Sequence, residues 1–236
     1  MITPSTPVHA TAPSRSQVPP GSRGRLVTDA PTRAFHALFA LSFVGAYLTA
    51  ESEYWRLLHV TLGYTFAGLL LFRLLYGLVG PRQVRLSVLW RKVTGALQWP
   101  RTLWTTRGLQ ASVWKQAPQA GMALTIGLIL LLVCPLALTG HATYNDWGDW
   151  IGGEWLEELH ELAANTTLAL VLAHMGLIAL LSLIRRQNQA MPMITGRLPG
   201  NGPSPVKHNH LWLAILVVLG VCAFWGWQLF SGQPLG

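Results

Sequence analysis

Long apolar runs dominate the pattern of hydrophobic and polar positions along the chain, and polar residues gather between them. A helix needs about 20 apolar residues to cross the hydrocarbon core of a bilayer. The first run is the shortest, so Arg33 and Glu51 would lie in the two interfaces. The pattern predicts an all-α, polytopic membrane helix bundle whose five spans cover residues 34–50, 57–79, 117–138, 159–184 and 211–230.

The segments outside these runs predict the domain organisation. Residues 1–26 are rich in Pro, Ser and Thr and contain no apolar run, so we expect a disordered tail rather than a cleaved signal peptide. Residues 27–197 hold the first four spans and form the predicted core. Residues 198–236 add a linker and a fifth transmembrane helix.

An additional, amphipathic helix is predicted between the second and third spans. Apolar side chains recur there at helical spacing next to Arg91 and Lys92, namely Leu86, Leu89, Trp90, Val93 and Leu97. Helices of this kind lie in the plane of the membrane surface. We therefore expect this one to rest on the inner membrane surface.

Composition agrees with a membrane protein, since 51% of the 236 residues are hydrophobic and 11% are charged. The two cysteines, Cys134 and Cys222, lie singly inside apolar runs, where we expect buried small side chains. Because the chain has no paired Cys motif, the sequence excludes covalent c-type haem attachment and a four-Cys iron–sulfur cluster.

Lysine and arginine residues near membrane spans stay on the cytoplasmic side, so their positions predict the orientation. Only Arg56 falls in the loops that we place outside. Those placed inside are Arg15, Arg23, Arg25, Arg33, Arg82, Arg85, Arg91, Lys92, Arg101, Arg107, Lys115, Arg185, Arg186, Arg197 and Lys207. We expect a multi-pass protein of a bacterial inner membrane, with a cytoplasmic amino terminus and a periplasmic carboxyl terminus. The lipid bilayer explains the formal charge of +8 better than nucleic acid does.

Four of the eight histidines lie inside apolar runs, and they are His36, His59, His160 and His174. Any one of them alone could serve as an interhelical hydrogen-bonding residue. The predicted orientation places His36 near the inner surface, and His59 and His160 near the outer one. His174 follows His160 by 14 residues, about 21 Å along a helix, and returns to within roughly 40° of the same face. We predict one histidine pair at each of two depths, His36 with His174 inside and His59 with His160 outside.

Two imidazoles at each depth fit a haem better than a bare metal ion. Zinc and copper normally take a third and a fourth protein ligand, whereas a haem supplies four nitrogens itself and needs only two axial ligands. Gly63, one turn after His59, and Gly176, close to His174, could admit a flat macrocycle, although glycine is common in membrane helices. The sequence predicts two haems b with bis-histidine ligation and no catalytic residue.

Arg73 lies in the middle of an apolar run, where an unpaired charge is unfavourable. It follows His59 by 14 residues and therefore shares its face, about 21 Å further inward, at the depth of the inner histidine pair. A propionate of the inner haem is the partner that we expect. The alternative is a side chain that extends to the nearby inner interface.

These residues resemble a known family, the bacterial cytochrome b-561 type, which includes the b-type cytochrome subunit of nickel–iron hydrogenases. The resemblance covers residues 27–197, and its motifs lie at residues 29–36, 58–64, 72–81, 159–165 and 193–197, together with His174. It implies a core of four helices around two haems b, whose ligands carry over to His36, His59, His160 and His174. We expect Arg33, Gly63, Arg73 and Arg197 to contribute to cofactor binding, and residues 193–197 to help close the inner pocket. The chain departs from the family by its fifth helix and by Ala37, where a Trp often follows the first ligand.

Two histidines per iron leave no open coordination position, so we expect outer-sphere electron transfer. The resemblance implies a relay between the quinone pool and a periplasmic redox protein, such as a c-type cytochrome or a hydrogenase or reductase subunit. An alternative is a self-sufficient, quinone-linked superoxide oxidase, but an acidic outer face disfavours an anionic substrate. A transporter that uses its histidines as a proton relay would carry no haem.

The acidic side chains suggest how a partner is recruited. Eight of the nine fall on the predicted outer side, mostly in the loop that leads into His160, and they are Glu51, Glu53, Asp146, Asp149, Glu154, Glu157, Glu158 and Glu161. The simple interpretation is that the distribution of lysine and arginine leaves them outside. The functional interpretation is that an acidic rim steers a basic redox partner toward the outer haem.

Overall fold

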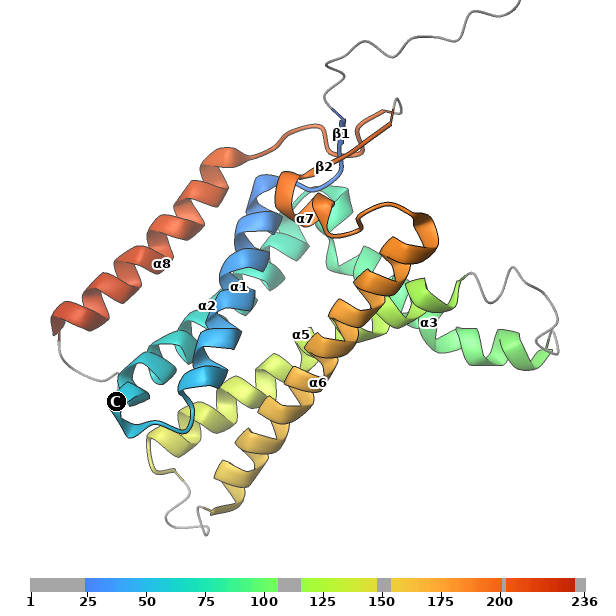
Figure 1. The fold of residues 1–236 in the computed structure, drawn as a ribbon. Coiled ribbons are helices and arrows are strands. Elements are labelled where there is room, and N and C mark those ends of the chain that lie inside the picture. The colour runs from blue at the N-terminus through green and yellow to red at the C-terminus, as the bar shows by residue number, and fades with distance from the viewer. Residues whose placement is uncertain (1–23, 106–115, 148–153, 201–202, 232–236) are drawn as a thin grey trace, which may run out of the picture.

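The structure of the chain is a computed structural model that describes residues 24–105, 116–147, 154–200 and 203–231, and the described part is almost entirely helical (Figure 1). Residues 1–23 of the predicted tail therefore lie outside the described residues. Five charged residues that the sequence analysis placed on one side of the membrane also lie outside them, namely Arg15 and Arg23 in that tail, and Arg107, Lys115 and Asp149.

Each of the five predicted spans forms a helix. These are α1 (Ala30–Thr49), α2 (Arg56–Val79), α5 (Ala117–Tyr144), α6 (Glu154–Arg185) and α8 (Leu211–Ser231). The last four are long and apolar enough to cross a membrane. Helix α1 is not among them, because Arg33 and His36 lower the hydropathy of its first turns. Its 20 residues span about 30 Å, so a crossing by α1 stays a prediction.

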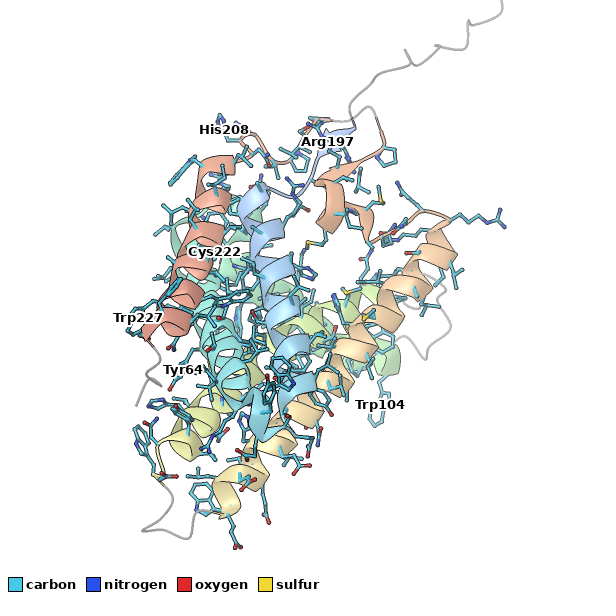
Figure 2. The ribbon with its side chains drawn as sticks, turned by 60° about the vertical axis from the view of Figure 1, so that its left-hand side comes forward. Tyr64, Trp104, Arg197, His208, Cys222 and Trp227 are labelled. Atoms are coloured by element: carbon cyan, nitrogen blue, oxygen red, sulfur yellow. The ribbon has the colours of Figure 1, made fainter. Side chains whose placement is uncertain are left out.

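The predicted amphipathic helix is also present, as α3 (Leu86–Thr105), and it extends beyond the predicted stretch. Val93 packs toward Gly127 of α5, and the side chain of Leu86 packs against Gly77 of α2. Trp90 and Trp104 are exposed on the other side of the helix, and Figure 2 shows Trp104 pointing away from the bundle. The position of α3 on the membrane surface stays a prediction.

Short elements connect the long helices and add a strand pair to the predicted all-α fold. They are the 3-10 helices η1 (Glu53–Trp55) and η2 (Arg82–Val84), the helix α7 (Met191–Thr195), and the strands β1 (Arg25–Leu26) and β2 (Arg197–Leu198). The two strands pair antiparallel, with Arg25 opposite Leu198. Strand β1 therefore consists of the last two residues of the segment 1–26 that the sequence analysis predicted to be a disordered tail.

The long helices associate in antiparallel pairs. Helix α1 packs on α2 and α5 packs on α6, while α2 also contacts α5 and joins the two pairs. Helix α8 lies against α1, on the side away from α6 (Figure 1). We call the end where α1 and α8 begin the inner end, and the opposite end the outer end, after the predicted orientation. Helices α1 and α6 diverge toward the inner end in both views (Figures 1 and 2).

Aromatic rings form much of the core between α1 and α2. Phe39 stacks on Phe66 with ring centroids 4.0 Å apart, and Phe35 and Phe43 extend the contact along α1 at 4.9 Å and 5.7 Å from these two rings. Each such pair adds about 0.5–1.5 kcal/mol beyond the area that it buries. The stack therefore fixes α1 on α2, although α1 is the one of the five predicted spans that is not long and apolar enough to count as a membrane-crossing helix.

Three details correct the sequence analysis. Helix α5 continues to Tyr144, so His141 lies inside a helix rather than after it. Helix α6 begins at Glu154, so four of the outer carboxylates belong to a helix rather than a loop, where acidic side chains near the amino-terminal turn interact favourably with the helix dipole. Cys134 and Cys222 are free and exposed instead of buried, because both face outward from their helices.

Candidate functional site

The structure brings together the predicted outer pair, His59 of α2 and His160 of α6. Their ring centroids are 6.2 Å apart and their planes meet at 78°. Both side chains are half-buried. Residues separated by about 100 positions in the sequence thus present two imidazoles to one another at the outer end of the bundle.

Backbone carbonyl groups orient both rings. The Nδ1 atom of His59 lies 2.8 Å from the carbonyl oxygen of Ala46, and Nδ1 of His160 lies 3.0 Å from that of Leu136. A carbonyl only accepts a hydrogen bond, so we assign the ring proton to Nδ1 in both residues. Each ring is left with Nε2 unprotonated and available as a metal ligand, as in proteins whose ligating histidines are held by a backbone carbonyl.

The spacing of this pair fits an iron between the two rings. A metal–nitrogen bond of about 2 Å places the centres of two axial imidazoles roughly 6 Å apart. Among the described residues, no group of three or more His, Cys, Asp or Glu side chains could hold a bare metal ion. A pair of histidines is what a haem requires, since the macrocycle supplies the other four ligands.

Gly140 of α5 allows the ring of His160 to reach this position. A Cβ atom added at Gly140 would lie 2.7 Å from Cε1 and 3.1 Å from Nδ1 of His160. Real Cβ atoms do not approach so closely, so a side chain here would displace the imidazole. The other two predicted glycines are different, because a Cβ at Gly63 or Gly176 would meet no heavy atom within 4 Å. Both therefore border open space, as the prediction for Gly63 required.

The inner pair, His36 of α1 and His174 of α6, is more open. The two rings are close enough to interact electrostatically. His36 is exposed and His174 is half-buried. The Nδ1 atom of His174 is buried and has no hydrogen-bond partner within the described part of the chain. A buried ring nitrogen without a protein partner is consistent with a group from outside the chain beside this ring.

Arg73 extends toward the inner end from its place in α2. Its Nη1 atom donates a hydrogen bond to the carbonyl oxygen of Val84, 3.0 Å away, and a Cβ added at Gly77 would lie 2.7 Å from the same atom. The guanidinium also interacts electrostatically with Asp29. These contacts place Arg73 at the inner end, and both its depth relative to the inner histidine pair and its role toward a propionate stay predictions.

The segment 193–197 lies over the start of α1, as expected. Arg33 donates a hydrogen bond from Nη1 to the carbonyl oxygen of Ile194 at 3.2 Å. Gly196 has a φ of 76°, a backbone conformation that favours glycine. A Cβ added there would lie 2.7 Å from the carbonyl oxygen of Thr28 and 3.1 Å from Nε of Arg33, so only glycine fits where this segment passes over the start of α1. Arg197 is exposed, donates to the carbonyl oxygen of Gly24 at 3.0 Å, and is seen at the inner end in Figure 2.

Two polar clusters were missed by the sequence analysis. At the inner end, the hydroxyl of Tyr76 donates to the buried carboxylate of Asp29. An Asp followed closely by a Pro, here Pro31, is a signature of a helix start and could have indicated the position of Asp29. At the outer end, the hydroxyl of Tyr64 lies 2.7 Å from Nδ1 of His141. His141 was missed because it follows the apolar run rather than lying within it.

Comparison with protein families matches residues 27–196 to the prokaryotic cytochrome b561 family. The chain belongs to the prokaryotic cytochrome b561 family. This confirms the resemblance found in the sequence, over almost the same residues. Searches of curated proteins and of solved structures found no match.

Membership of the cytochrome b561 family makes the chain a multi-pass membrane cytochrome of b type that takes part in electron transport. The family implies haem b and redox partners that include a quinone. The match ends at Gly196, before the linker and α8, so the fifth helix lies outside the part of the chain that matches the family. The family match by itself gives neither the number of haems nor their ligands.

Proposed function

We propose that the chain is a di-haem relay that carries electrons between the quinone pool and a periplasmic redox protein. The observation that supports this most directly is the pair formed by His59 and His160, with ring centroids 6.2 Å apart and both Nδ1 atoms held by carbonyl groups. A protein that only needed these histidines for packing would not need both Nε2 atoms to be left unprotonated.

Two haems b would be held, one at each depth. His59 and His160 ligate the outer one through Nε2, and His36 and His174 ligate the inner one. Arg33 and Arg73 hold propionates of the inner haem, while Gly63 leaves room for a macrocycle, and Arg197 fixes the strand next to this pocket. A haem bound in this way supplies reversible one-electron chemistry at an iron without a free coordination position. The protein fixes position, ligand geometry and solvent access.

The partner docks at the outer end, next to the outer pair. Seven exposed carboxylates surround this end within the described residues, and they are Glu51, Glu53, Asp146, Glu154, Glu157, Glu158 and Glu161. One of these, Glu53, forms an exposed ion pair with Arg56 at 3.9 Å. An acidic rim favours a basic protein such as a c-type cytochrome domain, because opposite surface charges speed association.

The experiment uses the purified protein with its haems bound. A short-chain quinol should reduce both haems under anaerobic conditions, and the reduced protein should then pass electrons to a basic c-type cytochrome. Replacing His59 by Ala should remove the outer haem, retain the inner one, and slow the second transfer while quinol still reduces the remaining haem. Unchanged transfer in this variant would contradict the relay.

A further inference from the structure

A buried carboxylate lies at the inner end of the bundle, about two helical turns before His36 of the inner pair. Asp29 is 2% exposed. Its Oδ1 accepts a hydrogen bond from the backbone N–H of Thr32 at 3.2 Å, and its Oδ2 accepts one from the hydroxyl of Tyr76 at 2.5 Å. A buried carboxylate is unfavourable unless hydrogen bonds or charges compensate it, so this pairing of Asp29 with a phenol at short distance calls for an explanation.

The region around Asp29 contains more polar atoms than the protein satisfies. Within the described residues, Thr32 Oγ1, Arg33 Nε and Asn209 Oδ1 are buried without a hydrogen-bond partner. The nearby charged groups are Arg33 and Arg73, of which Arg73 interacts electrostatically with Asp29. Buried polar atoms of this kind are usually satisfied by water or by a bound polar group. The inner end therefore has the polar lining that a proton path needs.

A chain of ring contacts links this cluster to the inner pair. Tyr76 stacks on Phe72 with centroids 5.6 Å apart and planes at 10°. Phe72 lies 6.5 Å from Phe35, the residue before His36. Arg33, with its unpaired Nε, lies three residues before His36 on the same helix. Phe72 and Phe35 thus lie between Tyr76 and the inner pair, and Asp29 lies about two turns of α1 before His36.

Reduction of a quinone requires protons as well as electrons, and a haem supplies only the electrons. Conversion of a quinone to a quinol takes two electrons and two protons, which turn both C=O groups into C–OH groups. Arginine stays protonated in proteins and cannot deliver a proton. Asp29 is the one Asp or Glu of the sequence that the predicted orientation places inside.

We propose that Asp29 and Tyr76 form the proton-transfer site for a quinone that is reduced next to the inner histidine pair. This inference rests on the proposed function. The haem that His36 and His174 would hold would supply the two electrons. The quinone receives its two protons by way of the Tyr76 hydroxyl and the Asp29 carboxyl group, which are each reprotonated from the aqueous phase at the inner end. In the opposite direction, quinol oxidation releases both protons through the same groups.

A purely structural role for Asp29, as the cap of α1, can be separated from this one. Asn caps helices as well as Asp does, and its amide oxygen can still accept from the Thr32 N–H while its NH2 group donates to the Tyr76 hydroxyl oxygen. Asp29→Asn therefore preserves the cap and the fold but cannot carry a proton. Tyr76→Phe removes the hydroxyl and keeps the stacking on Phe72. Tyr54→Phe is the matched control for Tyr76→Phe, since Tyr54 is 84% exposed at the outer end.

The experiment mixes the dithionite-reduced, haem-loaded protein, freed of excess reductant, with one of two oxidants under anaerobic conditions. A short-chain ubiquinone analogue requires protons, whereas ferricyanide takes one electron and none. We expect Asp29→Asn and Tyr76→Phe to slow haem oxidation by the quinone at least about tenfold, with ferricyanide oxidation unchanged. Tyr54→Phe should match the wild type with both oxidants. A second readout is infrared difference spectroscopy on reduction, in which the wild type should show a carboxyl band that Asp29→Asn lacks.

Several outcomes would overturn the inference. Wild-type quinone rates in Asp29→Asn would leave Asp29 as a helix cap alone. Slowing by both oxidants would mean that the substitution disturbs the haems or electron transfer instead of proton transfer. A wild-type protein that is oxidised by ferricyanide but never by the quinone would contradict the proposed function itself, which separates that failure from the failure of this site.

Discussion

The two outer histidines are oriented by backbone carbonyl groups of neighbouring helices. Ala46 belongs to α1 and Leu136 to α5, so the ring of His59 depends on α1 and that of His160 on α5. The approach of α5 requires Gly140, where an added Cβ would lie 2.7 Å from the His160 ring. Ligand geometry at single residues is therefore set by helix packing.

Gly140→Ala tests this dependence. The added methyl group should displace His160 and lower the haem content from two to about one per chain, although alanine favours a helix over glycine by about 1 kcal/mol. Gly220→Ala in α8 is the control, because a Cβ there meets nothing within 4 Å. A haem-binding assay with both variants measures the effect. Full haem content in Gly140→Ala would show that His160 can move without losing its ligand.

Arg73→Gln tests the predicted charge partner of the inner haem. A positive charge about 10 Å from a haem favours the reduced state by about 1–2 kcal/mol at an effective dielectric constant near 20, so its loss should lower one of the two midpoint potentials by several tens of millivolts. Redox titration followed by absorbance measures both potentials. Arg185→Gln removes an exposed charge from the same end and should leave both within about 10 mV. Equal shifts in the two variants would reject a specific role for Arg73.

Much of the site could be predicted from single residues, since the depth of each histidine follows from helix position and from the distribution of lysine and arginine. The Asp29–Tyr76 and Tyr64–His141 pairs could not, because each joins residues that lie far apart in the sequence. Only the packing of α1 on α2, and of α2 on α5, brings them together. An apolar run shows that a helix is buried in lipid, but it does not show which faces of two helices meet.

At the scale of elements, α8 is joined to the core by a polar contact inside the apolar bundle. Trp225 donates a hydrogen bond from Nε1 to Oγ1 of Thr65, 2.8 Å away. Gln228, one turn later, is 2% exposed, and both of its amide atoms are buried without a partner in the described residues. Such contacts fix the register of one membrane helix against another. The sequence predicted the existence of α8, and its partner helix became visible only from the packing.

Two substitutions in α8 should change stability in opposite directions. Trp225→Phe removes the hydrogen bond and should lower the free energy of unfolding by about 0.6 kcal/mol. Gln228→Leu removes an unpaired buried amide, whose desolvation is unfavourable by about 1–3 kcal/mol, and should raise the melting temperature. Thermal unfolding in detergent, followed by haem absorbance, measures both. A lower melting temperature for Gln228→Leu would mean that this amide has a partner.

At the scale of the whole molecule, charge separates the two ends of the bundle. The outer end carries the exposed carboxylates and the inner end carries the arginines of α3, the end of α6, β2 and the adjoining turns. Surface attraction of this kind acts over about 10 Å at 0.1 M salt. The five long helices, the amphipathic helix α3 and the separation of charge could all be predicted from the sequence. The start of α6 at Glu154 could not, because acidic residues are compatible with either a loop or a first helical turn.

Electron exchange with a basic c-type cytochrome should therefore slow as ionic strength rises. Neutralising four acidic residues together should lower the association rate by about tenfold or more and change the final electron distribution less. Stopped-flow measurements at several salt concentrations would test the set Asp146, Asp149, Glu154 and Glu157. A rate that is indifferent to salt and to these substitutions would indicate a permanently bound partner instead.

The central claim is that four histidines hold two haems, and a haem count tests it most directly. The purified protein should contain two haems b per chain, quantified by a reduced-minus-oxidised spectrum against protein concentration. His59→Ala and His36→Ala should each retain about one haem, and His208→Ala, at the surface of the inner end (Figure 2), should retain both. A wild-type protein with a single haem, or with none, would contradict the account.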